Sequence, residues 1–382
     1  MRKIIPYGRQ YIDEKDIEAV VEVLKGDYLT TGPHVEKFEK TFAEKVGARY
    51  AVAVSSGTAA LHLSCLAAGI RTGDEVITTP MTFAASANCA IYTGAKPVFA
   101  DIEENTGSLD AEKMKEKITD KTKAVIPVHY TGLPCDMEKI KEVADNHNLV
   151  VIEDACHALG ARYKNSIIGD CKYSDMTVFS FHPVKHITTG EGGMITTNSE
   201  EWYHKLLSLR SHGITRRQGD FTETSHGGWY YEMQSLGFNY RLTDIQAALG
   251  LSQLQKLDWF VEKRREIAGI YNLELKELPL ELPREKKGFY SSYHLYVIKL
   301  KKEASLNRKE LYDRLRERNI YTQVHYIPVH TLPYYQHMYG YKWGDYPVAE
   351  EHYRRVLSLP IYPGLTEDEI YRVIKILREV VA

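Results

Sequence analysis

No stretch of this 382-residue chain comes near the ~20 consecutive apolar residues that a membrane helix needs. The first residues also lack the apolar core of a signal peptide, because a charged run at residues 13–16 follows almost at once. Neither sign of charge dominates: the net charge is −2, so no long-range field favours nucleic acid or an anionic lipid surface. We therefore expect a cytoplasmic protein with no membrane partner and no nucleic-acid partner.

Cysteine is scarce, and the five cysteines contain no C-x-x-C pair. This pattern argues for a reducing compartment and against a disulfide framework or a structural zinc site. His325 and His330 lie close together, but no third ligand cluster accompanies them, so we expect no metal site. The chain also has no G-x-x-x-x-G-K-[ST] and no G-x-G-x-x-G after a strand, so the P-loop and dinucleotide-binding hypotheses lack their motifs.

Strand-like and helix-like segments alternate from residue 50 onward. Strands are predicted at 50–54, 75–78, 97–100, 124–128, 149–153, 176–181 and 193–197, and helices at 58–68, 84–92, 109–118, 137–147 and 200–209. This alternation predicts an α/β fold with a mostly parallel sheet that helices cover on both faces. Ligands of such sheets bind in the loops at the carboxyl ends of the strands.

The flanking regions follow a different pattern. Two helices (13–25 and 35–46) precede the alternation, and a long polar loop (213–237) and a long helix (242–271) follow it. The last part has predicted strands at 292–300 and 321–326 and predicted helices at 308–318, 349–357 and 367–381. Because single cores stop growing near ~250–300 residues, we expect a large domain at 1–250 and a small C-terminal α+β domain at 251–382.

A single lysine follows one of the buried runs. The strand at 176–181 ends at Pro183, since proline removes a donor from the strand ladder, and Lys185 comes next in a loop rich in Thr and Gly. An amine at a strand end can be partly desolvated, which lowers its pKa and lets the neutral amine form a Schiff base. Taken alone, Lys185 fits a solvated surface residue better, and only its surroundings favour the Schiff base.

Two other strand ends carry polar groups. Residues 55–60 (Ser-Ser-Gly-Thr-Ala-Ala) lie between a strand and a helix, where backbone N–H groups and the helix dipole can hold a phosphate; a plain N-cap is the alternative. Asp154 ends a buried strand, where it can accept a hydrogen bond from a protonated ring nitrogen, or cap the next helix. His157 can orient Asp154 or simply pack in the core.

Two further segments add an aromatic face and possible donors. Phe83 follows the strand at 75–78 and can present its ring to a flat ligand, or belong to the core. Residues 237–241 precede the long helix and can bind a phosphate or carboxylate, or form a structural turn. Together the strand ends supply an anion cradle, a flat apolar face, a carboxylate and a lysine. A pyridoxal phosphate enzyme needs this set of groups.

These motifs resemble those of the DegT/DnrJ/EryC1/StrS sugar aminotransferases. The resemblance covers nearly the whole chain and depends on residues 56–61, 79–83, 153–157, 180–193 and 237–241. It implies the fold of the type I pyridoxal phosphate enzymes, with a seven-stranded sheet and a smaller C-terminal domain. It also implies a homodimer with shared active sites. Some members of the group are dehydratases with histidine at the lysine position; here that position is Lys185, with His186 beside it, which favours transamination.

The resemblance assigns roles to individual residues. Lys185 is the catalytic residue and is covalently linked to pyridoxal 5′-phosphate, Asp154 pairs with the ring nitrogen, and Asn239 reaches the phosphate in the neighbouring subunit. Phe83 stacks on the ring, and His157 supports the ring substituents. The full set of expected cofactor-binding residues is Ser56, Gly57, Thr58, Ala59, Phe83, Asp154, His157, Ser180, Lys185 and Asn239.

Within the family, the pattern is most similar to the aminotransferases of the pseudaminic acid pathway. The expected sugar-nucleotide contacts are Tyr7, Asp27, Tyr28, Leu29, Thr30, Gln323, Val324, His325 and Tyr326. The resemblance thus implies transfer of an amino group from L-glutamate to the C4 keto group of a UDP-4-keto-6-deoxy-N-acetylhexosamine. The alternatives are another sugar nucleotide (a UDP-bacillosamine precursor, a GDP-perosamine precursor or a dTDP-sugar) and a regulator without enzymatic activity. The net charge of −2 argues against a regulator that binds nucleic acid.

Overall fold

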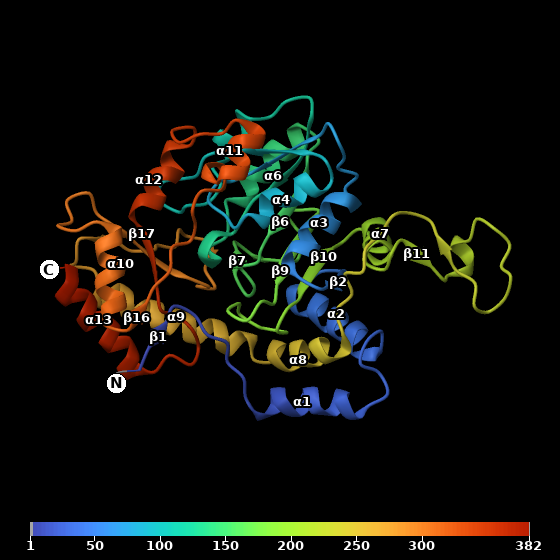
Figure 1. Ribbon diagram of the computed structural model, residues 1–382, viewed down its shortest axis with the longest axis horizontal. Coiled ribbons are helices and arrows are strands. Elements are labelled where there is room, and N and C mark those ends of the chain that lie inside the picture. Colours follow the sequence, from blue (N-terminus) through green and yellow to red (C-terminus); the bar gives the residue numbers. More distant parts are fainter. Residues whose placement is uncertain (1–2, 382) are drawn as a thin grey trace.

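The computed structural model describes residues 3–381, and its centre is a seven-stranded sheet of order β2-β10-β9-β6-β5-β3-β4 (Figure 1). Within this sheet β10 runs antiparallel to both neighbours, and the other four pairings are parallel. The predicted α/β fold with a mostly parallel sheet is therefore confirmed. The strands are β2 (Tyr50–Val54), β3 (Glu75–Thr78), β4 (Lys96–Phe99), β5 (Thr122–Ile126), β6 (Val150–Asp154), β9 (Met176–Ser180) and β10 (Gly193–Thr197).

Successive residues of the central strands pack into two different hydrophobic clusters. In β6, Val151 belongs to one cluster and Ile152 to the other, and Ala53 and Val54 of β2 divide in the same way. Adjacent strand residues point to opposite faces, so each strand must be apolar on both sides. The continuous apolar runs in the sequence are the direct consequence of this double burial.

Helices cover both faces of the sheet. On one face lie α3 (Gly57–Ala67), α4 (Ala85–Tyr92) and α7 (Glu200–Arg210). On the other face lie α2 (Pro33–Val46), α5 (Ala111–Lys115), α6 (Met137–Asn146) and α8 (Asp244–Leu254). Outside this second layer, α1 (Glu14–Lys25) packs along α8 (Figure 1).

A separate hydrophobic cluster holds the C-terminal part together. Its elements are α9 (Leu257–Glu274), β13 (Leu280–Glu281), β15 (Tyr296–Leu300), α10 (Arg308–Glu317), β16 (Ile320–Tyr321), β17 (Val356–Leu359) and α13 (Glu367–Val381). The first strand, β1 (Ile5–Pro6), pairs with β16, and its Ile5 side chain is buried in this same cluster. The domain boundary after residue 250 stays a prediction, and the packing of Ile5 places the N-terminal strand with the C-terminal elements.

The helix expected at 242–271 is two helices, and in this detail the sequence prediction is wrong. α8 ends at Leu254 and α9 begins at Leu257. At the junction, the Lys256 ammonium pairs with Asp13 (2.8 Å) and Asp16 (2.7 Å) at the start of α1. This contact joins residues about 240 positions apart, so the helical periodicity of the segment contains no sign of it.

Several shorter elements also differ from their predicted limits. The strand expected at 321–326 is limited to β16, and beyond it Gln323 forms one bridge to Ser358. The helix expected at 109–118 is only α5, and the segment expected as helix 349–357 is α12 followed by β17. The remaining elements are α11 (Pro333–Tyr339), α12 (Pro347–Arg355), β7 (Arg162–Tyr163), β8 (Ser166–Ile167), β14 (Phe289–Tyr290) and 3-10 turns at Tyr130–Gly132, Gln218–Asp220 and Val329–Thr331.

The polar loop expected at 213–237 forms an arm that projects from the body of the molecule (Figure 1). Its base is a short hairpin of β11 (Ile214–Thr215) and β12 (Glu232–Met233). The Glu232 carboxylate accepts hydrogen bonds from the Thr222 and Glu223 backbone N–H groups (2.7 and 2.9 Å), which fold the tip back on the hairpin. Within residues 3–381, no helix has both the length and the apolar character of a membrane span.

Candidate active site

Two neighbouring strands end beside each other at the carboxyl edge of the sheet. β6 ends at Asp154 and β9 at Ser180, and Asp154 pairs in register with Val178. The Asp154 side chain is buried. Its Oδ2 accepts a hydrogen bond from Ser86 Oγ (2.6 Å), and its Oδ1 accepts one from the Cys156 backbone N–H (3.1 Å). The carboxylate is thus held at both oxygens.

The N-terminus of α3 lies at the same edge. Ser56 caps the helix by accepting a hydrogen bond from the Ala59 N–H (3.1 Å). A Cβ on Gly57, the first helical residue, would lie 3.0 Å from Ser180 Cβ and 3.1 Å from Cys156 Sγ. The glycine therefore allows the starts of three loops to meet. Free N–H groups and the positive end of the helix dipole make this junction suitable for a phosphate.

Lys185 lies in the loop that leaves β9. Its backbone N–H donates to the His182 carbonyl (2.9 Å), which closes a turn around Pro183. Burial lowers the pKa of the Lys185 ammonium; the nearby Asp154 carboxylate opposes this shift, and the buried Arg264 guanidinium adds to it. An amine with a lowered pKa is more often neutral near pH 7, which is the form that acts as nucleophile or base.

His157 lies close to two other rings. Its ring is 4.4 Å from that of His294 and 5.9 Å from that of Tyr326, measured between centroids, and its Nε2 lies 2.9 Å from the Tyr326 hydroxyl. Burial, with the nearby Lys185 ammonium, holds the pKa of His157 well below its usual value, so the imidazole is neutral. Its Nδ1 is buried and has no hydrogen-bond partner among the described residues.

Phe83 offers an open aromatic face near these groups. Its side chain is 62% exposed, and its ring centroid is 6.2 Å from that of Tyr326. Phe83 lies in the segment between β3 and α4. In the same segment the hydroxyl oxygen of Thr82 lies 2.7 Å from that of Ser86 in α4. The core alternative for Phe83 is wrong, because a ring so exposed does not contribute to the hydrophobic core.

These groups fit pyridoxal phosphate on the chemistry of their donors and acceptors. The cradle around Gly57 suits a phosphate, the Asp154 carboxylate suits a protonated ring nitrogen, and the Lys185 amine suits an aldehyde carbon. The unpartnered Nδ1 of His157 is a buried polar atom that a polar ring substituent would satisfy. Among residues 3–381 no group of three or more His, Cys, Asp or Glu side chains is placed to hold a metal ion.

Three of the expected sugar-nucleotide residues lie next to this site. The Tyr7 ring is 5.2 Å from the His325 ring, and the Tyr326 hydroxyl reaches His157. His325 also bonds to Ser358 Oγ through Nδ1 (2.8 Å), so its ring is held from both sides. Gln323 is exposed and Val324 is half-buried on the same segment.

The other expected residues lie on different elements. Residues 27–30 contact the start of α8: the Asp244 N–H donates to the Leu29 carbonyl (3.0 Å), and Thr30 forms a bridge to Thr243. Asn239 is exposed at the base of the arm, where it forms a bridge to Ser211. The roles of residues 27–30 and Asn239 remain predictions.

Three residues near the site were not found from the sequence. Ser86 binds Asp154, His294 packs on His157, and Arg264 lowers the pKa of Lys185. Arg264 is buried and donates to the His294 and Ile361 carbonyls (3.1 and 2.9 Å). A buried arginine in a long amphipathic helix was a possible signal, whereas nothing in the local sequence marks Ser86 or His294.

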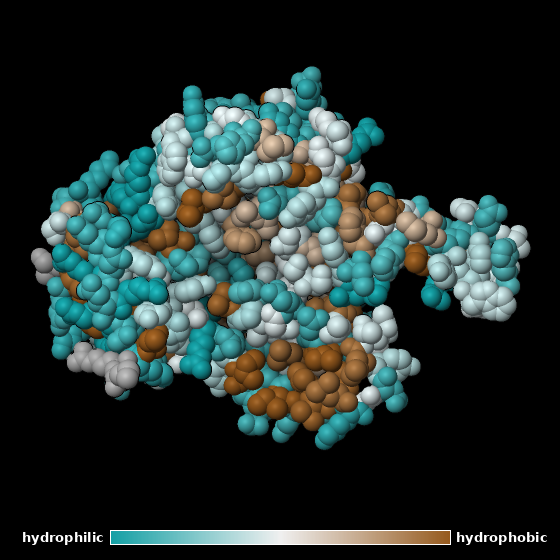
Figure 2. Space-filling model, viewed as in Figure 1, coloured by the Kyte–Doolittle hydropathy of each residue, from teal (hydrophilic) through white to brown (hydrophobic). Residues whose placement is uncertain are grey.

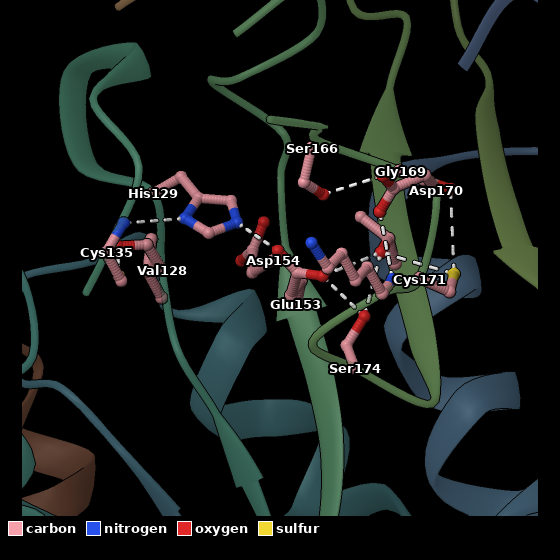
Figure 3. Close-up of polar contacts among 12 residues, drawn as sticks. Val128, His129, Cys135, Glu153, Asp154, Ser166, Gly169, Asp170, Cys171 and Ser174 are labelled. Atoms are coloured by element: carbon pink, nitrogen blue, oxygen red, sulfur yellow. Dashed lines mark hydrogen bonds and ion pairs between the residues drawn. The ribbon is translucent and has the colours of Figure 1, made fainter. Parts of the chain in front are cut away.

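Behind the Asp154 carboxylate, a buried polar network fixes the end of β6 (Figure 3). Glu153 Oε2 lies 2.6 Å from His129 Nε2, and His129 Nδ1 accepts a hydrogen bond from the Cys135 N–H (3.0 Å). Ser174 and Thr177 donate to the other oxygen of Glu153. Burial alone would raise the pKa of Glu153, but these hydrogen bonds outweigh it and lower that pKa.

A family model and several relatives match this chain over almost its full length. The family model described as "DegT/DnrJ/EryC1/StrS aminotransferase family" matches residues 10–378. The spore coat polysaccharide biosynthesis protein SpsC of Bacillus subtilis is 46% identical, covering 99% of this chain and 97% of the relative. A UDP-4-amino-4,6-dideoxy-N-acetyl-beta-L-altrosamine transaminase of Campylobacter jejuni is 38% identical (94% and 93%), and a GDP-perosamine synthase of Escherichia coli O157:H7 is 37% identical (99% and 98%).

Solved structures agree with this result. Helicobacter pylori PseC, an aminotransferase of pseudaminic acid biosynthesis, superposes with a TM-score of 0.91 at 33% identity and covers 99% of both chains. The PLP form of the sugar aminotransferase Spr1654 of Streptococcus pneumoniae has a TM-score of 0.91 at 29% identity and covers 100% of both chains. The chain therefore belongs to the DegT/DnrJ/EryC1/StrS aminotransferase family and is a sugar aminotransferase that depends on pyridoxal 5′-phosphate.

Proposed function

We propose that the enzyme moves an amino group from L-glutamate to the C4 keto group of a UDP-linked 4-keto-6-deoxy-N-acetylhexosamine. The observation that carries the proposal is the meeting of three strand ends at Gly57, where a Cβ would lie 3.0 Å from Ser180 and 3.1 Å from Cys156. That meeting joins the candidate phosphate cradle, the Asp154 strand and the Lys185 loop. The similarity to the transaminase of Campylobacter jejuni and to PseC supports this choice of sugar.

The proposed cofactor site uses each group for one part of pyridoxal phosphate. The cradle formed by Ser56, Gly57, Thr58, Ala59 and Ser180 binds the phosphate. Asp154 keeps the ring nitrogen protonated, Phe83 covers one ring face, and His157 binds a ring substituent. When bound, the cofactor supplies a carbonyl carbon that condenses with amines and a ring that accepts the electron pair of a breaking C–H bond.

Lys185 moves the protons in both halves of the proposed reaction. Its Nζ holds the cofactor until an amino donor takes its place, and the freed amine then accepts the proton from the α-carbon of glutamate. In the second half, the same Nζ delivers a proton to C4 of the sugar. Burial lowers the Lys185 pKa, so the freed amine is available as a base close to neutral pH.

The remaining expected residues orient the sugar nucleotide. Tyr7, Tyr326 and His325 form a partly buried wall beside His157, and Gln323 extends from the same segment towards solvent. An aromatic wall with a few polar groups is the usual lining of a site for a small organic ligand. We assign residues 323–326 to contacts with the sugar and its nucleotide.

The proposed enzyme is a homodimer in which Asn239 of one subunit reaches the cofactor phosphate in the other. Asn239 is exposed and forms a bridge to Ser211, just after the segment 213–237 that makes the arm. An apolar face on α1 is also exposed (Figure 2), with Ile17, Val21 and Leu24 at 48%, 37% and 55%. Contiguous exposed apolar surface of this kind is typical of a protein–protein interface.

A second candidate substrate is a GDP-linked 4-keto-6-deoxy sugar. The similarity to the GDP-perosamine synthase favours it, because that relative is 37% identical and matches 99% of this chain. Both candidates require the same chemistry at C4 and differ in the nucleotide and in the substituent at C2. The choice between them depends on the residues around the sugar nucleotide and leaves Lys185 and Asp154 in the same roles.

Turnover on a panel of sugar nucleotides tests the proposal. The purified holoenzyme is incubated with L-glutamate and with the UDP-, GDP- and dTDP-linked 4-keto-6-deoxy sugars, and the products are identified by mass spectrometry and NMR. We expect a 4-amino sugar from the UDP-linked N-acetyl substrate, with 2-oxoglutarate formed in equal amount. Turnover on the GDP-linked sugar alone would establish the second candidate in its place.

A further inference from the structure

The hydroxyl of Tyr326 bonds to His157, whose other ring nitrogen has no partner among the described residues. Tyr326 Oη lies 2.9 Å from His157 Nε2, and the two ring planes are nearly parallel, at 26°. His157 Nδ1 is buried without a hydrogen-bond partner among the described residues. The His294 ring also packs against His157, with 4.4 Å between the ring centroids, so the imidazole has little freedom to turn.

The protons of Tyr326 and His157 can be placed in two ways, and only one of them leaves a single polar group without a hydrogen-bond partner. Burial raises the pKa of the Tyr326 phenol well above its usual value, and burial lowers the pKa of His157 well below its usual value. Both groups are therefore neutral, and each carries one proton. If Tyr326 donates to Nε2, the His157 proton is on Nδ1, and only that N–H lacks a partner. If Nε2–H donates instead, both Nδ1 and the phenol proton lack one.

The Tyr326 hydroxyl is held in place by the segment that carries it. The Tyr326 backbone N–H donates to the sulfur of Met81 (3.4 Å). The preceding carbonyl, that of His325, accepts a hydrogen bond from the Tyr130 hydroxyl, and the His325 ring bonds to Ser358 (2.8 Å). Contacts from three separate parts of the chain thus hold the backbone from which the Tyr326 ring extends to His157.

We propose that Tyr326 is a positioning residue that fixes His157 in the tautomer with the proton on Nδ1. His157 then presents an N–H donor to an electron-rich oxygen on the cofactor ring. This inference rests on the proposed role of His157 at the cofactor. It also gives the segment 323–326 a second role, because besides contacting the sugar nucleotide this segment sets the hydrogen bond that the protein offers to the cofactor.

The tautomer of His157 is directly measurable. In the holoenzyme labelled with ¹⁵N at histidine, the ring nitrogen shifts separate the two neutral tautomers, and His157→Gln identifies the signal by its loss. We expect the Nδ1–H tautomer in the wild-type enzyme and a mixture in Tyr326→Phe. Tyr296→Phe is the matched control, because it removes a buried hydroxyl that bonds to Asn272 (2.7 Å) and makes no contact with His157.

Cofactor affinity supplies the second readout. Tyr326→Phe removes the neutral hydrogen bond that favours the Nδ1–H tautomer of His157. This loss should weaken pyridoxal phosphate binding about 2- to 12-fold. In a His157→Leu background the same tyrosine change should have no further effect, because the group that Tyr326 positions is absent. An unchanged ¹⁵N pattern in Tyr326→Phe, or full additivity of the two changes, overturns the inference. Failure of the wild-type enzyme to bind the cofactor would instead contradict the proposed function.

Discussion

Ser86 in α4 donates a hydrogen bond of 2.6 Å to Asp154, which lies 68 positions further along the chain at the end of β6. Thr82, one turn before Ser86, approaches the same hydroxyl at 2.7 Å, so the Ser86 proton is directed to the carboxylate. The start of α4 thereby holds the acid that we assign to the cofactor ring nitrogen. This relationship makes Ser86 part of the site through its bond to Asp154.

Ser86→Ala should weaken cofactor binding. Hydrogen bonds to charged groups contribute about 1.5–3 kcal/mol, so the dissociation constant of pyridoxal phosphate should rise by roughly one to two orders of magnitude. Titration of the apoenzyme followed by fluorescence or calorimetry measures the change. The matched control is Ser64→Ala, which also removes a buried hydroxyl from a helix but loses only a bond to the Ala60 carbonyl (2.8 Å). Equal effects of the two substitutions would show that Ser86 has no special link to the cofactor.

Lys185→Ala should abolish the covalent attachment of the cofactor. After reduction with borohydride, the wild-type enzyme should retain the cofactor mass in an intact mass spectrum, and the variant should not. Because Lys185 is also the proposed general base, turnover should fall by at least about 10²–10⁴-fold. Lys172→Ala, a change at an exposed lysine, should leave both measurements unchanged. Reduced cofactor that stays attached in Lys185→Ala would place the attachment at another lysine.

Gly57→Ala should reduce affinity for the phosphate of the cofactor. The new methyl group would lie 3.0 Å from Ser180 Cβ and 3.1 Å from Cys156 Sγ, so at least one of these loops must move. Binding of pyridoxal phosphate should weaken much more than binding of pyridoxal, which lacks the phosphate. Gly269→Ala in α9 is the control, because a Cβ there meets nothing within 4 Å and should slightly stabilise the helix. An equal loss for both ligands would argue that the cradle does not hold the phosphate.

The sheet could be predicted because the amino-acid sequence of each strand reflects its burial on both faces. Residues 149–152 are apolar without a break, as expected of a strand covered on both faces. The break between α8 and α9 was not predictable, since Lys256 pairs there with Asp13 and Asp16 from the opposite end of the chain. The same reason applies to β1, whose burial depends on a strand more than 300 residues away.

In the candidate site, too, some residues could be predicted from the sequence and others could not. Lys185, Asp154 and the segment around Gly57 follow strands directly, so the alternation of strands and helices is enough to bring them to one edge of the sheet. Ser86 and His294 contact the site through a helix and a loop whose local sequences are ordinary for such elements. Their positions follow from tertiary packing, which no pattern of spacing in a single sequence describes.

Glu153→Gln should flatten the dependence of stability on acid pH. The hydrogen bonds at Glu153 lower its pKa in the folded state, so its contribution to stability is present above the unfolded value of about 4.3 and is lost as pH falls through the lower folded value. The wild-type thermal midpoint should therefore drop steeply below about pH 4.3, and the variant should lose less over that range. At pH 7 the variant should be about 1.5–3 kcal/mol less stable, because an amide replaces the carboxylate that accepts hydrogen bonds from His129, Ser174 and Thr177.

Thermal unfolding at a fixed scan rate from about pH 3 to pH 7 measures both effects. Glu116→Gln is the control, since it removes an exposed pair with Lys113 and should change the midpoint very little. A wild-type profile that is flat below about pH 4.3 would show that Glu153 is not ionised in the folded protein.

Mixed dimers should recover activity that neither parent variant has. In the proposed homodimer, each site combines Lys185 of one subunit with Asn239 of the other. Lys185→Ala should inactivate the enzyme, and Asn239→Ala should empty the sites when the cofactor is limiting. A dimer formed from one subunit of each kind carries one site with both substitutions and one site with neither. After random exchange of subunits, roughly a quarter of the wild-type activity should return, because half of the dimers are mixed and each has one native site of two.

The measurement is turnover at limiting pyridoxal phosphate before and after the two variants are unfolded and refolded together. Lys185→Ala refolded with Lys172→Ala gives the reference for ordinary subunit exchange, in which no new kind of site is created. If Asn239 instead serves the cofactor of its own subunit, every site in the mixed dimer carries one defect and the activity stays at the level of the parents. Recovery therefore distinguishes a shared site from two independent ones, and it does so without any knowledge of the sugar.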